Sequence, residues 1–188
     1  MAENILVCTA WPYANGSIHI GHVAGCYLPA DIFARFHRLA GNNVIMVSGS
    51  DAHGTPVTIT AEALNISPED VADKYQKEFL FDWSKLGINF DLFTSTHTKN
   101  HEKVSQDIFT KLYERGLIYK DSMSQPFCEH HNRFLADRYV EGDCPVCSAS
   151  GARGDQRDDC GATYEANELV NPRSKLDSSS AIEVRDTE

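Results

Sequence analysis

Residues 4–22 read Asn4-Ile5-Leu6-Val7-Cys8-Thr9-Ala10-Trp11-Pro12-Tyr13-Ala14-Asn15-Gly16-Ser17-Ile18-His19-Ile20-Gly21-His22. The first six residues form a compact apolar run typical of a β-strand, and a loop rich in turn residues follows them. A helical pattern then begins near Ile20 and continues to Ala40, where Gly41 ends it. A strand, a glycine-containing loop and a helix start, in this order, are where α/β folds bind nucleotides. Free N–H groups and the helix dipole favour phosphate there, so the stretch predicts a phosphate-binding turn.

Two histidines in this stretch, His19 and His22, are three residues apart and therefore share one face of the first helical turn. Two imidazoles aimed at one point can donate hydrogen bonds to oxygens that gain charge as a phosphorus becomes five-coordinate. Each well-placed donor of this kind contributes roughly 3–4 kcal/mol. Gly21 between them leaves room for a flat ring against the backbone. Without context such a pair is more typical of a protein surface, but its position directly after a strand and a turn favours catalysis.

Strands and helices alternate through the first 118 residues. A second buried strand, Val44–Val47, leads into Ser48-Gly49-Ser50-Asp51. Further elements are expected as helices at Val57–Leu64, from Ser67 as the cap to about Leu86, and at Asn100–Arg115, and as a short strand at Ile88–Phe90. This alternation predicts a parallel sheet with crossover helices.

The composition indicates a soluble globular protein. The chain has 188 residues and a formal net charge of −10, with 41% apolar and 23% charged residues. Its longest apolar runs are too short for a membrane span or a signal-peptide core. The acidic balance argues against a surface that binds nucleic acid all over, although it allows a local basic patch. Four cations on the last predicted helix indicate an ordinary solvated face and give no argument for tRNA contact: Lys99, Lys103, Lys111 and Arg115.

Most of the cysteines crowd into the second part of the chain, at Cys128, Cys144, Cys147 and Cys160. With no secretory segment, this clustering indicates metal binding in a reducing cytosol and not a disulfide framework. Paired ligands two residues apart, repeated after a loop, are the usual way to build a tetrahedral zinc site. Helical periodicity also fades from about residue 118, so we divide the chain into residues 1–118 and 119–188.

Three separated motifs resemble class I aminoacyl-tRNA synthetases. Residues 10–22 look like the HIGH signature of that class, and their Pro-Tyr-Ala-Asn-Gly lead-in is similar to the methionyl-tRNA synthetase form. Gly49–Pro56 resembles that family's second nucleotide-fold segment, and Phe134–Gly142, ahead of a Cys-Pro-x-Cys knuckle, resembles its connective insertion. The resemblance covers nearly the entire chain. It implies the α/β class: the first half of a Rossmann-like parallel-sheet nucleotide-binding fold in residues 1–118, and a zinc-ribbon connective insertion in residues 119–188.

The resemblance implies the chemistry of an ATP-dependent methionine--tRNA ligase. Such enzymes join methionine to ATP, giving methionyl-adenylate and pyrophosphate, and pass the methionyl group to tRNA(Met). Mg²⁺ accompanies the ATP. His19 and His22 are implied to be catalytic and to contact the ATP phosphates. The other ATP-binding residues implied are Asn15, Gly16 and Gly21, the last of them beneath the adenine.

The resemblance also implies a methionine site. Asp51, at the carboxyl end of the second strand, is expected to hold the substrate ammonium, with a helix-cap aspartate as the alternative. Ala10, Trp11 and Tyr13 are expected to form a wall for the thioether, because aromatic faces suit polarizable sulfur. Trp11 and Tyr13 could equally be core residues near a turn. His53 is expected to be structural.

The family pattern also suggests how the zinc ligands are grouped. Some relatives carry Cys at eight knuckle positions and hold two zinc ions, one between the inner knuckles and one between the outer knuckles. Here the inner pair keeps Cys144, Cys147 and Cys160 and has Arg157, whose guanidinium has no lone pair to offer a metal. Zinc at this site is expected to be structural.

The outer pair of knuckles is less complete. It keeps Cys128 and His131, has Asp177 as a further candidate ligand, and carries Ser174, a poor ligand. Two alternatives stay open. One is a regrouped set of ligands, and the other is a metal-free ribbon held by packing alone. The regrouped set consists of Cys128, His131, Cys144 and Cys147.

The sequence lacks the family's Lys-Met-Ser-Lys-Ser loop and its helical anticodon-binding domain. We therefore expect it to be the N-terminal part of a larger cytoplasmic synthetase, with its insertion cut short at the end and with little or no activity by itself. Two other functions stay open: a non-catalytic, synthetase-derived binding module, and a nucleotidyltransferase with a His-x-Gly-His phosphate site. Nucleotidyltransferases lack a knuckle insertion, which argues against the second. The sequence gives no prediction of oligomeric state.

Overall fold

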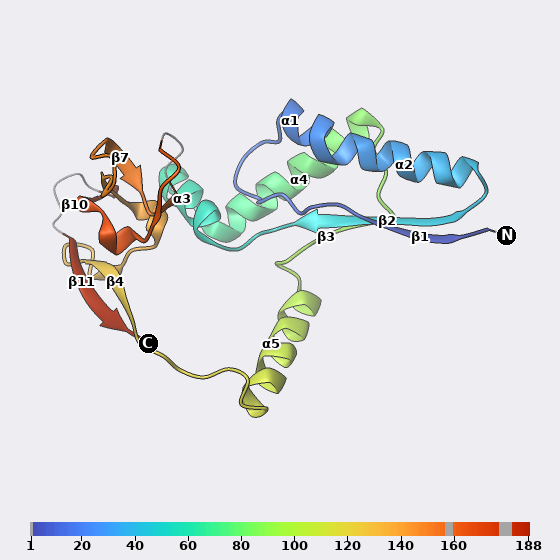
Figure 1. Cartoon of the computed structure of the whole chain (residues 1–188). Helices are drawn as coiled ribbons and strands as arrows, with labels where there is room; N and C mark the ends of the chain where they lie inside the picture. The colour runs from blue at the N-terminus through green and yellow to red at the C-terminus, as the bar shows by residue number, and fades with distance from the viewer. Residues whose placement is uncertain (1, 157–159, 177–181) are drawn as a thin grey trace. The chain divides into compact units, whose positions relative to one another are not determined.

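A computed structural model describes residues 2–156, 160–176 and 182–188, with the backbone alone for residues 155 and 156. The chain forms two compact units, Met1–Glu114 and Arg115–Glu188. Each unit has its own secondary structure (Figure 1). No helix in the described ranges is long and apolar enough to cross a membrane.

A three-stranded parallel sheet forms the centre of the first unit. It consists of β1 (Asn4–Cys8), β2 (Asn43–Ser50) and β3 (Leu92–Ser95), in the order β1-β2-β3. Leu6 pairs with Ile45 and Val47 with Leu92. The predicted parallel sheet is therefore confirmed. Because all three strands run the same way, their carboxyl ends meet at one edge, where nucleotide sites form in such folds.

The helical segment after β1 follows the predicted span. It runs through α1 (Ile20–His22), a π-helical stretch η1 (Val23–Tyr27) and α2 (Leu28–Leu39). Within η1 the N–H of Leu28 donates to the carbonyl of Val23, five residues back. Pro29 has no N–H, and in a regular helix its ring would crowd the carbonyl four residues earlier. The wider π turn directly before Pro29 relieves that crowding.

Two further helices cross from β2 to β3. They are α3 (Thr55–Leu64) and α4 (Pro68–Leu86), and both were predicted from the sequence. The hydroxyl of Ser67 accepts the N–H of Asp70 and so caps α4 as expected. Figure 1 shows α2 and α4 on the same side of the sheet. The core between these elements has nine buried side chains: Ala14, Tyr27, Ala34, Met46, Ala52, Ala72, Phe79, Trp83 and Ile88.

The predicted strand at Ile88–Phe90 is wrong, because the third strand begins at Leu92. The backbone before it is used elsewhere. Gly87 ends α4 in the left-handed conformation, and the N–H of Ile88 donates back to the carbonyl of Trp83. The N–H of Asn89 donates to the buried carboxylate of Asp31 on α2. These groups cap a helix and tie it to its neighbour, so they are not available for a strand ladder.

The last helix of the first unit, α5 (Lys99–Glu114), agrees with the helix predicted at 100–115. All of its residues are exposed. Two of the cations named above are in exposed ion pairs on this helix, Lys99 with Glu102 and Lys111 with Asp107. This matches the solvated face expected for the helix.

The second unit is built mainly from short antiparallel strands. One sheet has the order β10-β6-β7, a second β11-β4-β5, and β8 pairs with β9. The strands of this unit are β4 (Met123–Cys128), β5 (Arg133–Phe134), β6 (Val140–Asp143), β7 (Ser150–Arg153), β8 (Asp155–Gln156), β9 (Thr163–Tyr164), β10 (Val170–Ser174) and β11 (Ile182–Thr187). Two single-turn 3-10 helices, η2 (Asp137–Tyr139) and η3 (Ala166–Glu168), lie between them.

Candidate functional site

The loop after β1 is joined to the end of β2 by backbone hydrogen bonds. The N–H of Ala14 donates to the carbonyl of Asp51 at 2.7 Å, and the N–H of Asp51 donates to the carbonyl of Pro12 at 2.8 Å. Tyr13 and Asp51 thereby form an isolated parallel bridge. The two motifs, which are far apart in the sequence, therefore meet at the carboxyl edge of the sheet.

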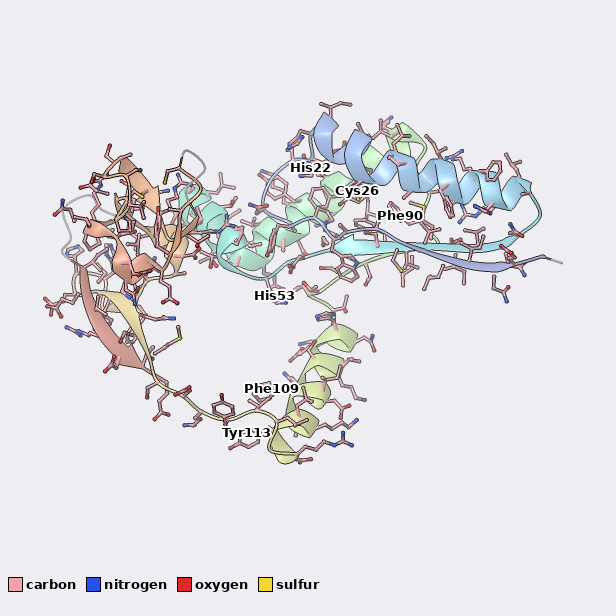
Figure 2. The ribbon with its side chains drawn as sticks, viewed as in Figure 1. His22, Cys26, His53, Phe90, Phe109 and Tyr113 are labelled. Carbon is pink, nitrogen blue, oxygen red and sulfur yellow. The ribbon has the colours of Figure 1, made fainter. Side chains whose placement is uncertain are left out.

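The two histidines of the first motif lie side by side at the start of α1. Their ring centroids are 4.0 Å apart with an interplanar angle of 37°, and both residues are exposed. The Nδ1 of His19 accepts the N–H of Gly21, and the Nδ1 of His22 accepts the N–H of His19. Because each Nδ1 is an acceptor, the neutral rings carry their proton on Nε2. Figure 2 labels His22 at this helix start.

The remaining residues of the predicted ATP site surround this pair. Asn15 and Gly16 form the turn before it and line a cavity of about 160 Å³ together with His22. A Cβ on Gly21 would lie 2.8 Å from Cε1 of His19. A side chain at position 21 would therefore displace the His19 ring, which is a packing reason for glycine at this position.

The carbonyl of Ala10 is held from two sides. The hydroxyl of Tyr27 donates to it at 3.0 Å, and the hydroxyl of Ser48 lies 3.4 Å from it. Burial, and next the neighbouring Cys26, raise the pKa of Tyr27 well above its usual value. The Tyr27 phenol therefore stays protonated and remains a donor, which fixes the backbone at the first residue of the motif.

Trp11 and Tyr13 are exposed and do not belong to the core. Their exposed fractions are 39% and 48%. The six-membered ring of Trp11 lies over Gly49 of β2, where an added Cβ would be 2.8 Å from two ring carbons and 2.8 Å from the carbonyl oxygen of Thr94. The Trp11 indole therefore packs directly against the backbone of Gly49.

We expect Gly49→Ala to lower the free energy of unfolding of the chain by about 1–3 kcal/mol, because the new methyl group has no space between the indole and the backbone of β3. Urea unfolding followed by circular dichroism measures this change. Gly25→Ala is the matched control, since a Cβ there meets nothing within 4 Å. Equal unfolding midpoints for the two variants would contradict the packing of Trp11 on Gly49.

Asp51 lies at the end of β2 with its carboxylate half-buried. One carboxylate oxygen, Oδ1, accepts the N–H of His53 at 3.2 Å and the hydroxyl of Thr96 at 3.3 Å. The next helix, α3, has Gly54 as its N-cap, so Asp51 is not the cap of that helix. Thr96 was not identified from the sequence, because no motif in the sequence links it to residue 51.

A second cavity lies next to Thr96, between the residues after β3 and the start of α5. Its volume is about 670 Å³, and its lining includes His53, Thr96 and His97. The Nε2 of His53 lies 3.4 Å from the carbonyl oxygen of Thr96, and the ring centroids of His53 and His97 are 5.9 Å apart. His53 therefore contacts the residue that follows β3, and the structural role expected for it stays a prediction.

Three thiols converge in the second unit. The Sγ atoms of Cys144, Cys147 and Cys160 all lie within 4.8 Å of one another, and those of Cys144 and Cys160 are 3.9 Å apart. Within the described ranges this is the only cluster of three or more candidate metal ligands. Arg157, which the family pattern places beside these thiols, lies outside the described residues.

The electrostatics of this thiol cluster suit a cation. The backbone N–H of Cys147, with that of Val146, holds the pKa of Cys144 at about 7 against the opposing effect of desolvation. At Cys160 the N–H of Ala162 favours the thiolate, but desolvation and the two neighbouring thiols outweigh it and raise the pKa. The surroundings thus favour a thiolate at Cys144 and disfavour a second one at Cys160, because two negative charges would lie close together. A bound cation would offset this repulsion.

The outer knuckles are brought together only in part. The Sγ of Cys128 lies 3.2 Å from the Nδ1 of His131. Ser174 is buried in β10, and its hydroxyl accepts the N–H of Leu176. Asp177 lies outside the described residues. Cys144 and Cys147 gather with Cys160 and not with Cys128 and His131, so the regrouped ligand set is not what the described residues form.

Comparisons with known proteins identify relatives along nearly the whole chain. Methionine--tRNA ligase of Thermomicrobium roseum is 58% identical over 176 residues, which are 94% of this chain and 30% of that protein. The ligase of Roseiflexus sp. is 54% identical over all 188 residues, 32% of its own length. The chain thus spans about a third of the length of these relatives. A structure of Mycobacterium tuberculosis methionyl-tRNA synthetase in complex with methionyl-adenylate shares the fold, with a TM-score of 0.66 at 24% identity over 98% of this chain and 31% of that chain.

The model of one protein family, described as tRNA synthetases class I (M), matches residues 5–188. The match includes both units and therefore the knuckle segment, which decides against the nucleotidyltransferase alternative. With the paired histidines after β1, Asp51 after β2 and the thiol cluster all inside the matched span, the chain belongs to the class I tRNA synthetases of the methionine type.

Proposed function

We propose that the protein to which this chain belongs is a methionine--tRNA ligase. It activates methionine with ATP to methionyl-adenylate and transfers the methionyl group to tRNA(Met). Relatives with 53–58% identity carry that name. The observation that carries the proposal is the geometry of His19 and His22, whose rings lie 4.0 Å apart at the start of α1 with both Nδ1 atoms engaged by backbone N–H groups.

The histidine pair would bind the phosphates of ATP. With both Nδ1 atoms accepting hydrogen bonds, the Nε2–H groups are the donors left for a ligand. They would stabilise the charge that develops on phosphate oxygens when the methionine carboxylate attacks the α-phosphorus and pyrophosphate leaves. Asn15 and Gly16 would support the nucleotide at the preceding turn, and Gly21 would face the adenine. Mg²⁺ would accompany the phosphates and offset their charge.

Methionine would bind between the two motifs. The substrate ammonium would pair with the carboxylate of Asp51, and the fixed backbone of Ala10 would define one side of the site. Trp11 and Tyr13 would contact the thioether, since both rings are accessible and aromatic faces suit sulfur. Catalysis of this kind is positioning together with charge stabilisation and needs no covalent enzyme intermediate.

The second unit would be a zinc-binding connective insertion. One structural ion would be held by Cys144, Cys147 and Cys160. It would crosslink a unit whose β-strands are too short to form a large core. Cys128 and His131, with Asp177, would form the outer site. The proposed activity also places the protein in the cytoplasm, where tRNA is charged.

A chimera tests the activity directly. The 188 residues of the Roseiflexus sp. ligase that align with this chain are replaced by this chain, and ATP–pyrophosphate exchange is measured with methionine. We expect exchange at a rate close to that of the parent ligase and none above background with leucine or isoleucine. A chimera that melts like the parent but shows no exchange would contradict the proposal and favour the non-catalytic binding module.

A further inference from the structure

The end of β3 holds the side chain of Asp51 through one hydroxyl. The Oγ1 of Thr96 donates to Oδ1 of Asp51 at 3.3 Å and accepts the N–H of Ala52 at 2.8 Å. A hydroxyl has one proton. Because Oγ1 accepts the N–H of Ala52, the Thr96 proton is free to point at the carboxylate of Asp51. The N–H of His53 adds a second donor to the same oxygen at 3.2 Å.

Thr96 is itself fixed in place. Its N–H donates to the carbonyl of Ser50 at 3.0 Å, and its carbonyl oxygen lies 3.4 Å from Nε2 of His53. The β2–β3 pairing, which ends with Ser50 opposite Ser95, sets this position. The backbone of Asp51 is held from the other side by Pro12 and Ala14. The backbone at both ends of the Thr96–Asp51 hydrogen bond is therefore held in place by hydrogen bonds.

The two oxygens of the Asp51 carboxylate differ as a result. Oδ1 accepts two hydrogen bonds, whereas Oδ2 has no hydrogen-bond partner among residues 2–156, 160–176 and 182–188. We propose that Thr96 is a positioning residue for the proposed reaction. Its hydroxyl holds Oδ1 and so turns Oδ2 of Asp51 toward the ammonium group of the amino acid. The proposal rests on the proposed function, because it assumes that Asp51 binds that ammonium.

The test uses the chimera described above with Thr96→Val, which keeps the shape of the side chain and removes the hydroxyl. We expect KM for methionine to rise about tenfold, since a hydrogen bond to a charged group is lost. We expect kcat to stay within about twofold, because Thr96 forms no hydrogen bond with a residue proposed to bind the ATP phosphates. Thr96→Ser keeps the hydroxyl and should restore a KM near the wild-type value. Thr96→Ala removes the hydroxyl without adding apolar bulk and should behave like Thr96→Val.

Two inhibitors separate positioning from a general structural effect. Methioninol keeps the ammonium group, and 4-(methylthio)butanoate lacks it. In Thr96→Val we expect the inhibition constant of methioninol to rise about tenfold and that of the deaminated acid to stay unchanged. Equal weakening of both inhibitors would overturn the proposal. Thr110→Val, which removes a hydroxyl bonded to its own helix through the carbonyl of Gln106, is the matched control and should change neither constant.

Asp51→Asn separates the proposed role of Asp51 from that of Thr96. If it leaves KM for methionine unchanged, Asp51 does not bind the ammonium, and both the assigned role of Asp51 and that of Thr96 fail. If it raises KM while Thr96→Val and Thr96→Ala do not, the role of Thr96 alone is wrong. A rise in KM in all three variants, with rescue by Thr96→Ser, supports the proposal.

Discussion

Replacing His19 by Ala in the chimera should lower the rate of ATP–pyrophosphate exchange about 10²–10³-fold, and His22→Ala should do the same. The loss of one preorganised donor to a transition-state oxygen has an effect of this size. The double variant should lose less than the product of the two factors, because both rings act on the same group of phosphate oxygens. Exchange at saturating methionine and ATP measures the effect on kcat.

His19 also has a structural role that has to be separated from this one. Its Nδ1 caps the first turn of α1 by accepting the N–H of Gly21. His19→Asn keeps a side-chain acceptor suited to an N-cap and removes the imidazole. We expect His19→Asn to melt near the wild-type temperature and to remain as inactive as His19→Ala. Recovery of exchange in His19→Asn would show that the imidazole ring itself is not required for catalysis.

His101→Ala is the matched control for a histidine in the first turn of a helix. His101 is exposed near the start of α5, and its N–H is bonded to the hydroxyl of Thr98. Exchange in this variant should equal that of the unmodified chimera. Unchanged exchange in His19→Ala and His22→Ala as well would contradict the catalytic role of the pair.

The elements that the sequence predicted correctly have local causes. Ser67 caps α4 through an atom three residues away, and Gly116, with a positive φ, follows the end of α5. The strand expected at Ile88–Phe90 failed because a distant group decides it. The carboxylate of Asp31, 58 residues earlier, takes the N–H of Asn89. The pattern of apolar residues does not reveal that the N–H of Asn89 bonds to Asp31 and not to a neighbouring strand.

The same distinction applies to the candidate site. The histidine pair and the pair Cys144 and Cys147 were predicted because a spacing of three residues along the chain brings their side chains together, whereas Cys160 was added from the family pattern. Thr96 could not be found in this way, because its bond to Asp51 joins residues 45 apart and depends on the register of β3 against β2. The position of the Trp11 ring likewise depends on Gly49, which leaves room for it on β2. The sequence predicted the chemistry, and the pairing of β3 with β2 brings Thr96 to Asp51.

Removal of one thiol from the cluster should release zinc from the second unit. We expect the wild-type chain, purified without chelator, to contain at least one zinc per chain, and Cys147→Ala to contain one zinc fewer. Structural zinc contributes about 10 kcal/mol or more to folding in zinc-finger peptides, far more than the packing of one exposed side chain. Residues 115–188 should then become sensitive to proteolysis while residues 1–114 resist it. Elemental analysis and limited proteolysis of the 188-residue chain measure both effects.

Cys8→Ala is the matched control, because Cys8 is also an exposed free cysteine but lies in β1, in the other unit. Its zinc content and protease pattern should equal those of the wild type. His131→Ala tests the outer knuckles. If this variant contains one zinc fewer than the wild type, a zinc ion binds beside Cys128. If its zinc content is unchanged, the inner cluster is the zinc site. Equal zinc in Cys147→Ala and Cys8→Ala would exclude zinc at the three thiols. The antiparallel sheets of the second unit would then be held by packing alone, which is the metal-free ribbon.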